Sequence, residues 1–390
     1  MYVSAWPGLT PGAFFRSPSK SPRPFPLNGV HSIAFYRARN AIYHLFRALD
    51  AGVGGTVLVP DYHSGNEIAA IRAAGARVRF YHVGRDLQPD LEQIERLCRD
   101  GARALLTIHY LGWPQPVEEL ARITSRHGTV LVEDCALAML SNLGSRPLGT
   151  FGRHAIFCLY KTLPLLHGGL AVQNGSPLKE LDTLALRPCG GLSLAGRTAE
   201  LFLEHVRSVA DTPGRILFAL KRGAGRALSA LKMDRVPVGD MGFDLDAVDV
   251  AISPVCQRLL QTFDYPEIHR RRRANYLHLS SRLSGQVAPL FPQLDEGVCP
   301  LFFPLLVSDK PSTARALRER GIQAVEFWNS GDVEATGTGF EDAQFLRDHV
   351  LELPIHQDIT AAQLDYMADH VLGLNAHSGI TRAHAPLQTV

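Results

Sequence analysis

Short apolar runs alternate with stretches of helical periodicity through the first half of the chain. The apolar runs are rich in Val, Ile and Leu, which is typical of buried parallel strands. They predict strands over residues 56–60, 77–83, 104–110, 129–135 and 155–160. Between these runs, apolar residues recur at helical spacing in 38–50 and 90–99, and the capping-box pattern "SGNE" predicts a helix that starts at Ser64. Alternating strands and helices predict an α/β domain with a mostly parallel sheet.

The pattern changes in the second half of the chain. We expect irregular helices over 176–247, including a basic amphipathic piece at 215–235, and then a helix pair or one long bent helix over 254–283. A strand is predicted at 301–307, and helices at 312–320 and 360–372, the last opened by the capping box "TAAQ". The predicted organisation is an extended Pro-rich arm (1–28), a large α/β domain (29–249), a small α+β domain (250–375) and a tail (376–390).

Composition narrows the class of protein. With 390 residues, 46% of them hydrophobic, the chain is large enough for two domains. A formal net charge of +2 gives no indication of a nucleic-acid partner. The 6 cysteines are too far apart for a zinc knuckle, so no metal site is predicted and reduced thiols in a cytoplasmic protein are expected. No segment has the apolar character of a signal peptide or of a membrane-spanning helix.

Polar and aromatic residues gather at the ends of the predicted strands. They are Tyr62, His63, His109, Tyr110, Glu133, Asp134 and Lys161. In an open α/β sheet, ligands bind beyond the carboxyl ends of the strands, so we expect these side chains to converge on one edge. A lysine and an aspartate there have two interpretations. They form a plain ion pair that closes the sheet edge, or they serve pyridoxal phosphate, which needs a lysine to bind its carbonyl carbon and a carboxylate to keep its ring nitrogen protonated.

Three segments around these residues resemble one family. "VEDCA" (132–136), "GSRPLGTFG" (144–152) and "IFCLYKTLPLLHGGLAV" (156–172) are similar to the DegT/StrS-type aminotransferases, and weaker similarity extends over about residues 30–375. The resemblance implies an aspartate-aminotransferase-like large domain (PLP fold type I) with a smaller C-terminal α+β domain, a pyridoxal 5'-phosphate cofactor and a homodimer. It also implies transfer of an amino group, from a donor such as glutamate, to a keto-sugar linked to a nucleotide, in surface polysaccharide or secondary-metabolite biosynthesis.

The resemblance carries roles over to particular positions. It implies that Lys161 is the lysine that binds the cofactor and that Asp134 is the partner of its ring nitrogen. The implied cofactor contacts are ring stacking by Tyr62 or His63, backbone phosphate donors at Ala38 and Arg39, and a phosphate-contacting side chain at the position of Cys158. For Tyr62, His63 and His109, a place in the pocket wall and a packed strand end remain open alternatives.

Four positions depart from the pattern of the family. Arg37 stands in place of a serine, Cys158 in place of the phosphate-contacting serine, and Leu137 in place of a histidine or glutamine. Asp249 stands where the family has an asparagine supplied by the partner subunit. These departures keep an alternative open, a binding or regulatory protein that has the fold but has lost turnover. A nicotinamide-dependent dehydrogenase is disfavoured, because "AGVGG" (51–55) precedes a strand rather than a helix.

Three further features receive structural interpretations. Gly168 and Gly169 are expected to form a tight turn beside Lys161. His167 is expected to be an exposed turn residue, and the arginines 270–273 are expected to be solvated.

Overall fold

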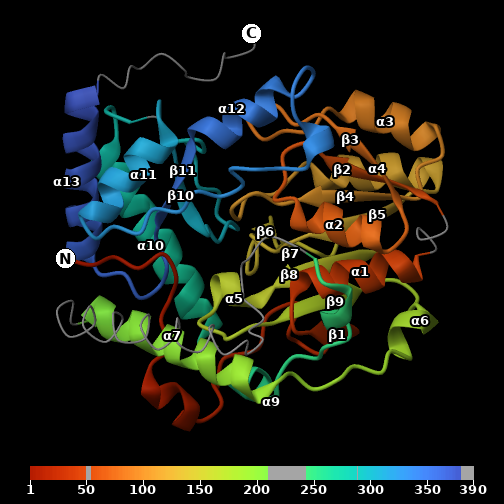
Figure 1. The fold of residues 1–390 in the computed structure, drawn as a ribbon, viewed down its shortest axis with the longest axis horizontal. Coiled ribbons are helices and arrows are strands. Elements are labelled where there is room, and N and C mark those ends of the chain that lie inside the picture. Colours follow the sequence, from red (N-terminus) through yellow and green to blue (C-terminus); the bar gives the residue numbers. More distant parts are fainter. Residues whose placement is uncertain (50–53, 210–242, 288, 379–390) are drawn as a thin grey trace.

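The larger part of the molecule is built around a seven-stranded mixed sheet (Figure 1). The computed structural model describes residues 1–49, 54–209, 243–287 and 289–378. The strand order is β1-β9-β8-β5-β4-β2-β3, and β9 alone runs against the other strands. The strands are β1 (Ser32–Phe35), β2 (Thr56–Pro60), β3 (Arg77–Tyr81), β4 (Ala104–Ile108), β5 (Val130–Asp134), β8 (His154–Cys158) and β9 (Gly169–Gln173). The five strands predicted in this half are present, with ends shifted by up to two residues.

Helices cover both faces of the sheet. Val57 and Val59 of β2 pack in a core with α1 (Ala38–Ala48) and α2 (Asn66–Ala73). Leu58, which lies between them, packs in a core with α3 (Leu91–Arg99) and α4 (Val117–His127). Side chains along a strand point alternately to opposite faces, so a fully apolar strand serves two cores at once. This doubly covered sheet is the α/β architecture that the sequence predicts.

Helix α2 begins two residues later than predicted. Gly65 precedes it with φ of 88°, and the helix starts at Asn66 rather than at Ser64. The predicted capping box is half formed, because the N–H of Ser64 donates to Oε1 of Glu67 at 3.1 Å while the Ser64 hydroxyl also bonds to that carboxylate. The positive φ, which glycine adopts without strain, lets the chain turn between the strand end and the helix.

The C-terminal part is built around a two-stranded antiparallel sheet. It consists of α9 (Pro254–Leu259), α10 (Tyr265–Leu283), β10 (Phe302–Leu306), α11 (Lys310–Glu319), α12 (Glu341–His349), β11 (Val350–Pro354) and α13 (Ala361–Ser378). Residues 254–283 therefore form a helix pair. The second capping box is complete, since Thr360 N–H donates to Gln363 Oε1 at 2.9 Å and Gln363 N–H donates to Thr360 Oγ1 at 3.3 Å.

The remaining described elements are short, except for one long helix. They are η1 (Pro11–Phe15), β6 (Asn142–Leu143), β7 (Arg146–Pro147), α5 (Leu159–Thr162), α6 (Lys179–Asp182), α7 (Gly191–Val209), η2 (Leu245–Ala247) and η3 (Val333–Ala335). The predicted basic amphipathic piece, 215–235, lies outside the described residues. Among the helices that are described, none combines the length and the apolar character needed to cross a bilayer.

The Pro-rich N-terminal segment is packed against the body of the protein. Val3 is fully buried, donates its N–H to Gly321 O at 2.9 Å and accepts the N–H of Gln323 at 3.0 Å. Tyr2 O accepts the side-chain amide of Gln363, so the segment lies beside α13, as Figure 1 shows. The chain start is therefore part of the C-terminal core, a position that its composition did not indicate.

Candidate active site

Asp134 and Lys161 line the same cavity, at the carboxyl ends of two neighbouring parallel strands. Asp134 is the last residue of β5, and β5 pairs with β8. Lys161 was predicted to end its strand, but β8 ends three residues earlier, at Cys158. Lys161 lies on the one-turn helix α5 that follows. Both side chains border a cavity of about 600 Å³. The structure therefore brings together the two residues on which the sequence interpretation depends.

Asp134 is a buried carboxyl group with a raised affinity for its proton. Burial is the main cause, followed by the nearby charge of Glu67, and together they raise the pKa of Asp134 to about 6. The N–H of Ala136 donates to Asp134 Oδ1 at 2.8 Å, and the positive charge of Lys161 works in the opposite direction to burial. A second positive charge in this cavity would therefore be favoured by the aspartate.

Glu67 contributes another buried carboxylate to the cavity wall. Its burial works to raise its pKa, but the interaction with neighbouring His63 and the hydrogen bonds from Ser64 outweigh burial, so the pKa of Glu67 is lowered. Glu67 is the residue that closes the capping box of α2, so its position follows from a local helix signal. Sequence reasoning found the capping role and missed the place in the cavity.

The start of α1 forms another part of the cavity wall. Ala38 and Arg39, the first two residues of this helix, both line the cavity. Gly169 lies against them, because a Cβ atom at this position would be 2.4 Å from Ala38 N. The backbone N–H groups and the dipole of a helix N-terminus favour an anion, and the absence of a side chain at 169 lets β9 approach this point closely.

Two of the departures from the family pattern also line the cavity. Cys158 is buried, and burial raises the pKa of its thiol, which leaves it neutral and a weak hydrogen-bond donor. Leu137 offers an apolar side chain at the same cavity. Asp249 takes part in another contact, with a carboxylate oxygen 3.1 Å from His44 Nε2.

Tyr62 and His63 are buried, but neither lines the cavity. The ring of Tyr62 makes an edge contact with Trp328, with centroids 4.9 Å apart. His63 stacks on Phe80 at 5.5 Å, its Nδ1 accepts the N–H of Gly65, and burial lowers its pKa to about 4. The structure thus places both residues behind the cavity wall, and ring stacking by either stays a prediction.

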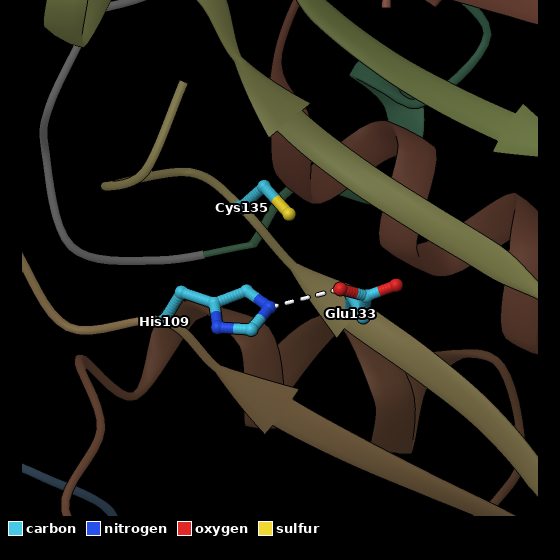
Figure 2. A group of neighbouring side chains, drawn as sticks. All are labelled: His109, Glu133 and Cys135. Carbon is cyan, nitrogen blue, oxygen red and sulfur yellow. Dashed lines mark hydrogen bonds and ion pairs between the residues drawn. The ribbon is translucent and has the colours of Figure 1, made fainter. Parts of the chain in front are cut away.

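His109 belongs to a separate hydrogen-bonded group on the other face of β5 (Figure 2). Its Nδ1 accepts the N–H of Gln115, so Nε2 carries the hydrogen and donates to Glu133 Oε2 at 3.0 Å. The Glu133 carboxylate also accepts the backbone N–H groups of Gly149, Phe151 and Gly152.

This group also contains Cys135 within ligand distance of His109 and Glu133, the composition of a metal site (Figure 2). Burial and the charges of Glu133 and Asp134 raise the pKa of the Cys135 thiol well above its ordinary value, so the thiol keeps its proton. With the histidine and the carboxylate already hydrogen-bonded, the group serves to hold the loop after β7 against the sheet.

Two interpretations of single residues were wrong. His167 is fully buried rather than exposed, and its ring packs on Tyr36 with centroids 4.1 Å apart. Arg272 is only 1% exposed rather than solvated. Its guanidinium donates to Gln357 Oε1, Leu301 O and Thr162 O, each at 3.0 Å. Because Thr162 follows Lys161, this buried arginine fixes the backbone that carries the lysine.

The cavity has a further wall that sequence reasoning did not find. It consists of Trp6, Arg197, Glu200, Glu326, Phe327, Trp328, Asn329 and Ser330. The ring of Phe327 lies 5.7 Å from Lys161 Nζ, within the range of a cation–π interaction. These residues come from the N-terminal segment, α7 and the loop after α11, which are far from the Asp134–Lys161 block in the sequence, so no local motif links them to it.

The fold is that of enzymes of PLP fold type I. The chain superposes on a putative sugar aminotransferase from Streptococcus pneumoniae in its PLP form with a TM-score of 0.70, over 96% of this chain and 99% of that chain, at 16% identity. It also superposes on the Helicobacter pylori aminotransferase PseC, involved in the biosynthesis of pseudoaminic acid, with a TM-score of 0.64 over 95% and 98% of the two chains, again at 16% identity.

Residues 27–198 match the DegT/DnrJ/EryC1/StrS aminotransferase family, which confirms the resemblance over this part of the chain. The chain is 27% identical to a GDP-perosamine synthase from Vibrio cholerae over 147 residues, 37% of this chain and 40% of that protein. It is 34% identical over 113 residues to a dTDP-4-dehydro-2,3,6-trideoxy-D-glucose 4-aminotransferase from Saccharopolyspora spinosa, 29% of each chain. The matches thus span less than half the length of these two relatives.

Proposed function

We propose that the chain is a pyridoxal-phosphate-dependent aminotransferase that moves an amino group from an amino-acid donor, glutamate, to a keto-sugar linked to a nucleotide. The observation that supports it most directly is the shared cavity of Asp134 and Lys161 at the ends of β5 and β8. A plain ion pair at the sheet edge explains the two charges but not the cavity of about 600 Å³ between them and the start of α1. Relatives with aminotransferase names support the same reaction class.

The residues in the cavity fit the proposed cofactor. When bound, pyridoxal phosphate supplies an electron sink for the pair of electrons left on the substrate carbon after deprotonation. Burial raises the pKa of Asp134, so a positive partner would stabilise its carboxylate, which in turn would hold the proton on the ring nitrogen. The backbone N–H groups at Ala38 and Arg39 would hold the phosphate, where Gly169 leaves room for close approach.

Lys161 has two tasks in this proposal. Its Nζ would bind the cofactor's carbonyl carbon in the resting protein, and once freed by the amino donor it would hold and move the proton taken from the substrate carbon. The Arg272 guanidinium fixes the adjacent carbonyl of Thr162, and the Phe327 ring lies 5.7 Å from Nζ, so the backbone and the amine of the lysine are each held in place.

The experiment is a spectrum of the purified protein with added pyridoxal phosphate. We expect a visible band from lysine-bound cofactor that is lost in Lys161→Ala. The matched control is Lys179→Ala, at an exposed lysine of α6, which should keep the band. A colourless wild-type protein in excess cofactor would overturn the proposal.

A second candidate function is a protein that binds the cofactor without turnover. The presence of Cys158 and Leu137 in the cavity favours it, because neither can donate a strong hydrogen bond to the cofactor's phosphate or to the hydroxyl oxygen on its ring. Mixing the cofactor-loaded protein with glutamate separates the two. Loss of the band with release of 2-oxoglutarate supports the aminotransferase, whereas a band that no amino acid discharges supports the binding protein.

The proposal also includes the oligomeric state of the protein and the kind of biosynthesis in which it takes part. We expect a homodimer, measured as twice the monomer mass of 42.8 kDa by light scattering. The nucleotide-sugar names of the relatives support a place in surface polysaccharide or secondary-metabolite biosynthesis.

A further inference from the structure

We propose that the N-terminal segment and α7 form the wall that recognises the acceptor sugar. In this proposal Trp6 stacks on the sugar ring, and the ion pair of Arg197 and Glu200 binds its hydroxyl groups. The inference rests on the proposed aminotransferase function and assigns acceptor selectivity to residues that lie far from the Asp134–Lys161 block in the sequence.

Trp6 is held at the cavity by packing on two sides. Its indole makes edge contacts with Phe302 at 5.1 Å and Phe327 at 6.1 Å between centroids, and Trp6 O accepts the hydroxyl of Ser4 at 3.0 Å. The indole is partly exposed and borders the cavity. A large aromatic surface that is fixed in place and faces a cavity binds a ring at low entropic cost.

The N-terminal segment and α7 are joined to each other. Tyr2 donates its hydroxyl to Glu204 at 2.7 Å, and Leu9 donates its N–H to Leu201 O at 3.2 Å. Gly8 lies so close to α7 that a Cβ atom there would meet His205 at 2.7 Å. The two segments therefore present Trp6 and the polar residues of α7 to the cavity as one unit.

Arg197 and Glu200 supply the polar part of this wall. They lie one turn apart on α7, with Arg197 Nη1 3.0 Å from Glu200 Oε2. The Arg197 Nε is buried and has no hydrogen-bond partner among the described residues. Sugar hydroxyl groups both donate and accept hydrogen bonds, so a guanidinium beside a carboxylate can satisfy two neighbouring hydroxyls.

The wall lies next to the reacting centre. Phe327 contacts Trp6 on one side, and its ring lies 5.7 Å from Lys161 Nζ on the other, so a single aromatic ring separates Trp6 from the amine. An acceptor whose carbonyl carbon reaches Lys161 therefore has its ring within reach of Trp6. A small oxo acid has no ring to stack there, and the wall thus favours a sugar over 2-oxoglutarate at the same reacting centre.

The test is a comparison of two acceptors on the same protein. Cofactor-loaded enzyme is first converted to its amine form with glutamate and is then mixed, in single turnover, with 2-oxoglutarate or with members of a panel of nucleotide-linked 4-dehydro sugars, including dTDP-4-dehydro-2,3,6-trideoxy-D-glucose. Both reactions use Lys161 and the same cofactor, so a folding or loading defect lowers both rates together. We expect Trp6→Ala to raise the half-saturating sugar concentration, relative to that for 2-oxoglutarate, by about tenfold or more.

Two further variants separate stacking from general damage. Trp6→Phe retains an aromatic face and should recover most of the selectivity, and Glu200→Gln should raise the half-saturating sugar concentration about tenfold through the loss of a charged acceptor. Equal effects of Trp6→Ala on both acceptors would overturn the inference. It would also be overturned by a wild-type enzyme that reacts with 2-oxoglutarate but with no sugar of the panel, a result that leaves the cofactor-binding role of Lys161 and the aminotransferase reaction standing but removes the keto-sugar acceptor.

Discussion

Replacing Asp134 with asparagine should stabilise the cofactor-free protein at neutral pH. The carboxyl group titrates at about 6 in the folded chain against an ordinary 3.8, chiefly because it is buried. The folded protein therefore binds this proton more tightly than the unfolded chain does. Below pH 3.8 Asp134 is protonated in both states and has little effect. Between pH 3.8 and about 6 it ionises in the unfolded chain but stays protonated in the folded one, so the fold progressively loses stability as the pH rises.

The magnitude follows from the shift. The two pKa values differ by slightly more than two units, and each unit corresponds to about 1.4 kcal/mol, so ionised Asp134 costs about 3 kcal/mol above pH 7. Asparagine has nearly the same shape, keeps an oxygen to accept the N–H of Ala136, and carries no charge. We expect the gain in unfolding free energy to be about 3 kcal/mol at pH 7.5 and to narrow to about 1 kcal/mol at pH 4.5.

The assay is urea unfolding of cofactor-free wild-type and Asp134→Asn proteins between pH 4.5 and 8. The matched control is Asp86→Asn. Asp86 is exposed and accepts the N–H of the residue two positions later, Gln88, at 3.0 Å, as Asp134 does from Ala136. The reasoning would be refuted if the difference in unfolding free energy between wild type and Asp134→Asn did not change with pH. It would also be refuted if the Asp134→Asn variant were no more stable than wild type at pH 7.5. The same substitution should weaken the binding of pyridoxal phosphate, because active-site groups are selected for the ligand rather than for stability.

Two further predictions concern residues around the cavity. Arg272→Met should lower the unfolding free energy by about 3–5 kcal/mol, measured by urea unfolding, because three buried acceptors lose a charged donor; a variant as stable as wild type would show that water replaces the guanidinium. Gly169→Ala should weaken pyridoxal phosphate binding about tenfold in an absorbance titration, since the added Cβ displaces the start of α1, whereas Gly373→Ala, in open space on α13, should leave the affinity unchanged.

The reaction half of the cavity could be predicted because its residues follow buried strands. Parallel strands bring their carboxyl ends to one edge, so the predicted strands placed Asp134 and Lys161 at the same edge, and the pairing of β5 with β8 makes their strands neighbours there. The errors in predicting which of these strand-end side chains reach the cavity are local. Side chains alternate along a strand, and one residue of register decides whether a group faces the cavity. Asp134 borders the cavity, whereas Glu133 faces the opposite side of the sheet with His109.

The buried polar residues show a different limit. Charge runs are usually solvated, and Arg272 violates this rule because three acceptors from distant segments, including Thr162 O, meet at one point. Turn residues are usually exposed, and His167 departs from that expectation because its ring is buried against Tyr36. In both cases the deciding partners lie far away in the sequence, so neither composition nor periodicity indicates them.

The wall of the cavity that contains Trp6, Arg197 and Glu200 is also formed by contacts between segments distant in the sequence. This origin has a consequence for the choice of acceptor. Trp6 reaches the site because Val3 and Tyr2 bind to the C-terminal part and to α7, which are contacts across most of the chain. The two groups that would carry out the chemistry, Asp134 and Lys161, are thus encoded in one short block, and those that would select the acceptor are encoded in segments far from it. Substitutions in the N-terminal segment or in α7 can therefore change the acceptor while leaving Asp134, Lys161 and the start of α1 in place. If instead such substitutions weakened cofactor binding as much as they altered acceptor choice, the two halves would be one structural unit, and this separation of roles would be wrong.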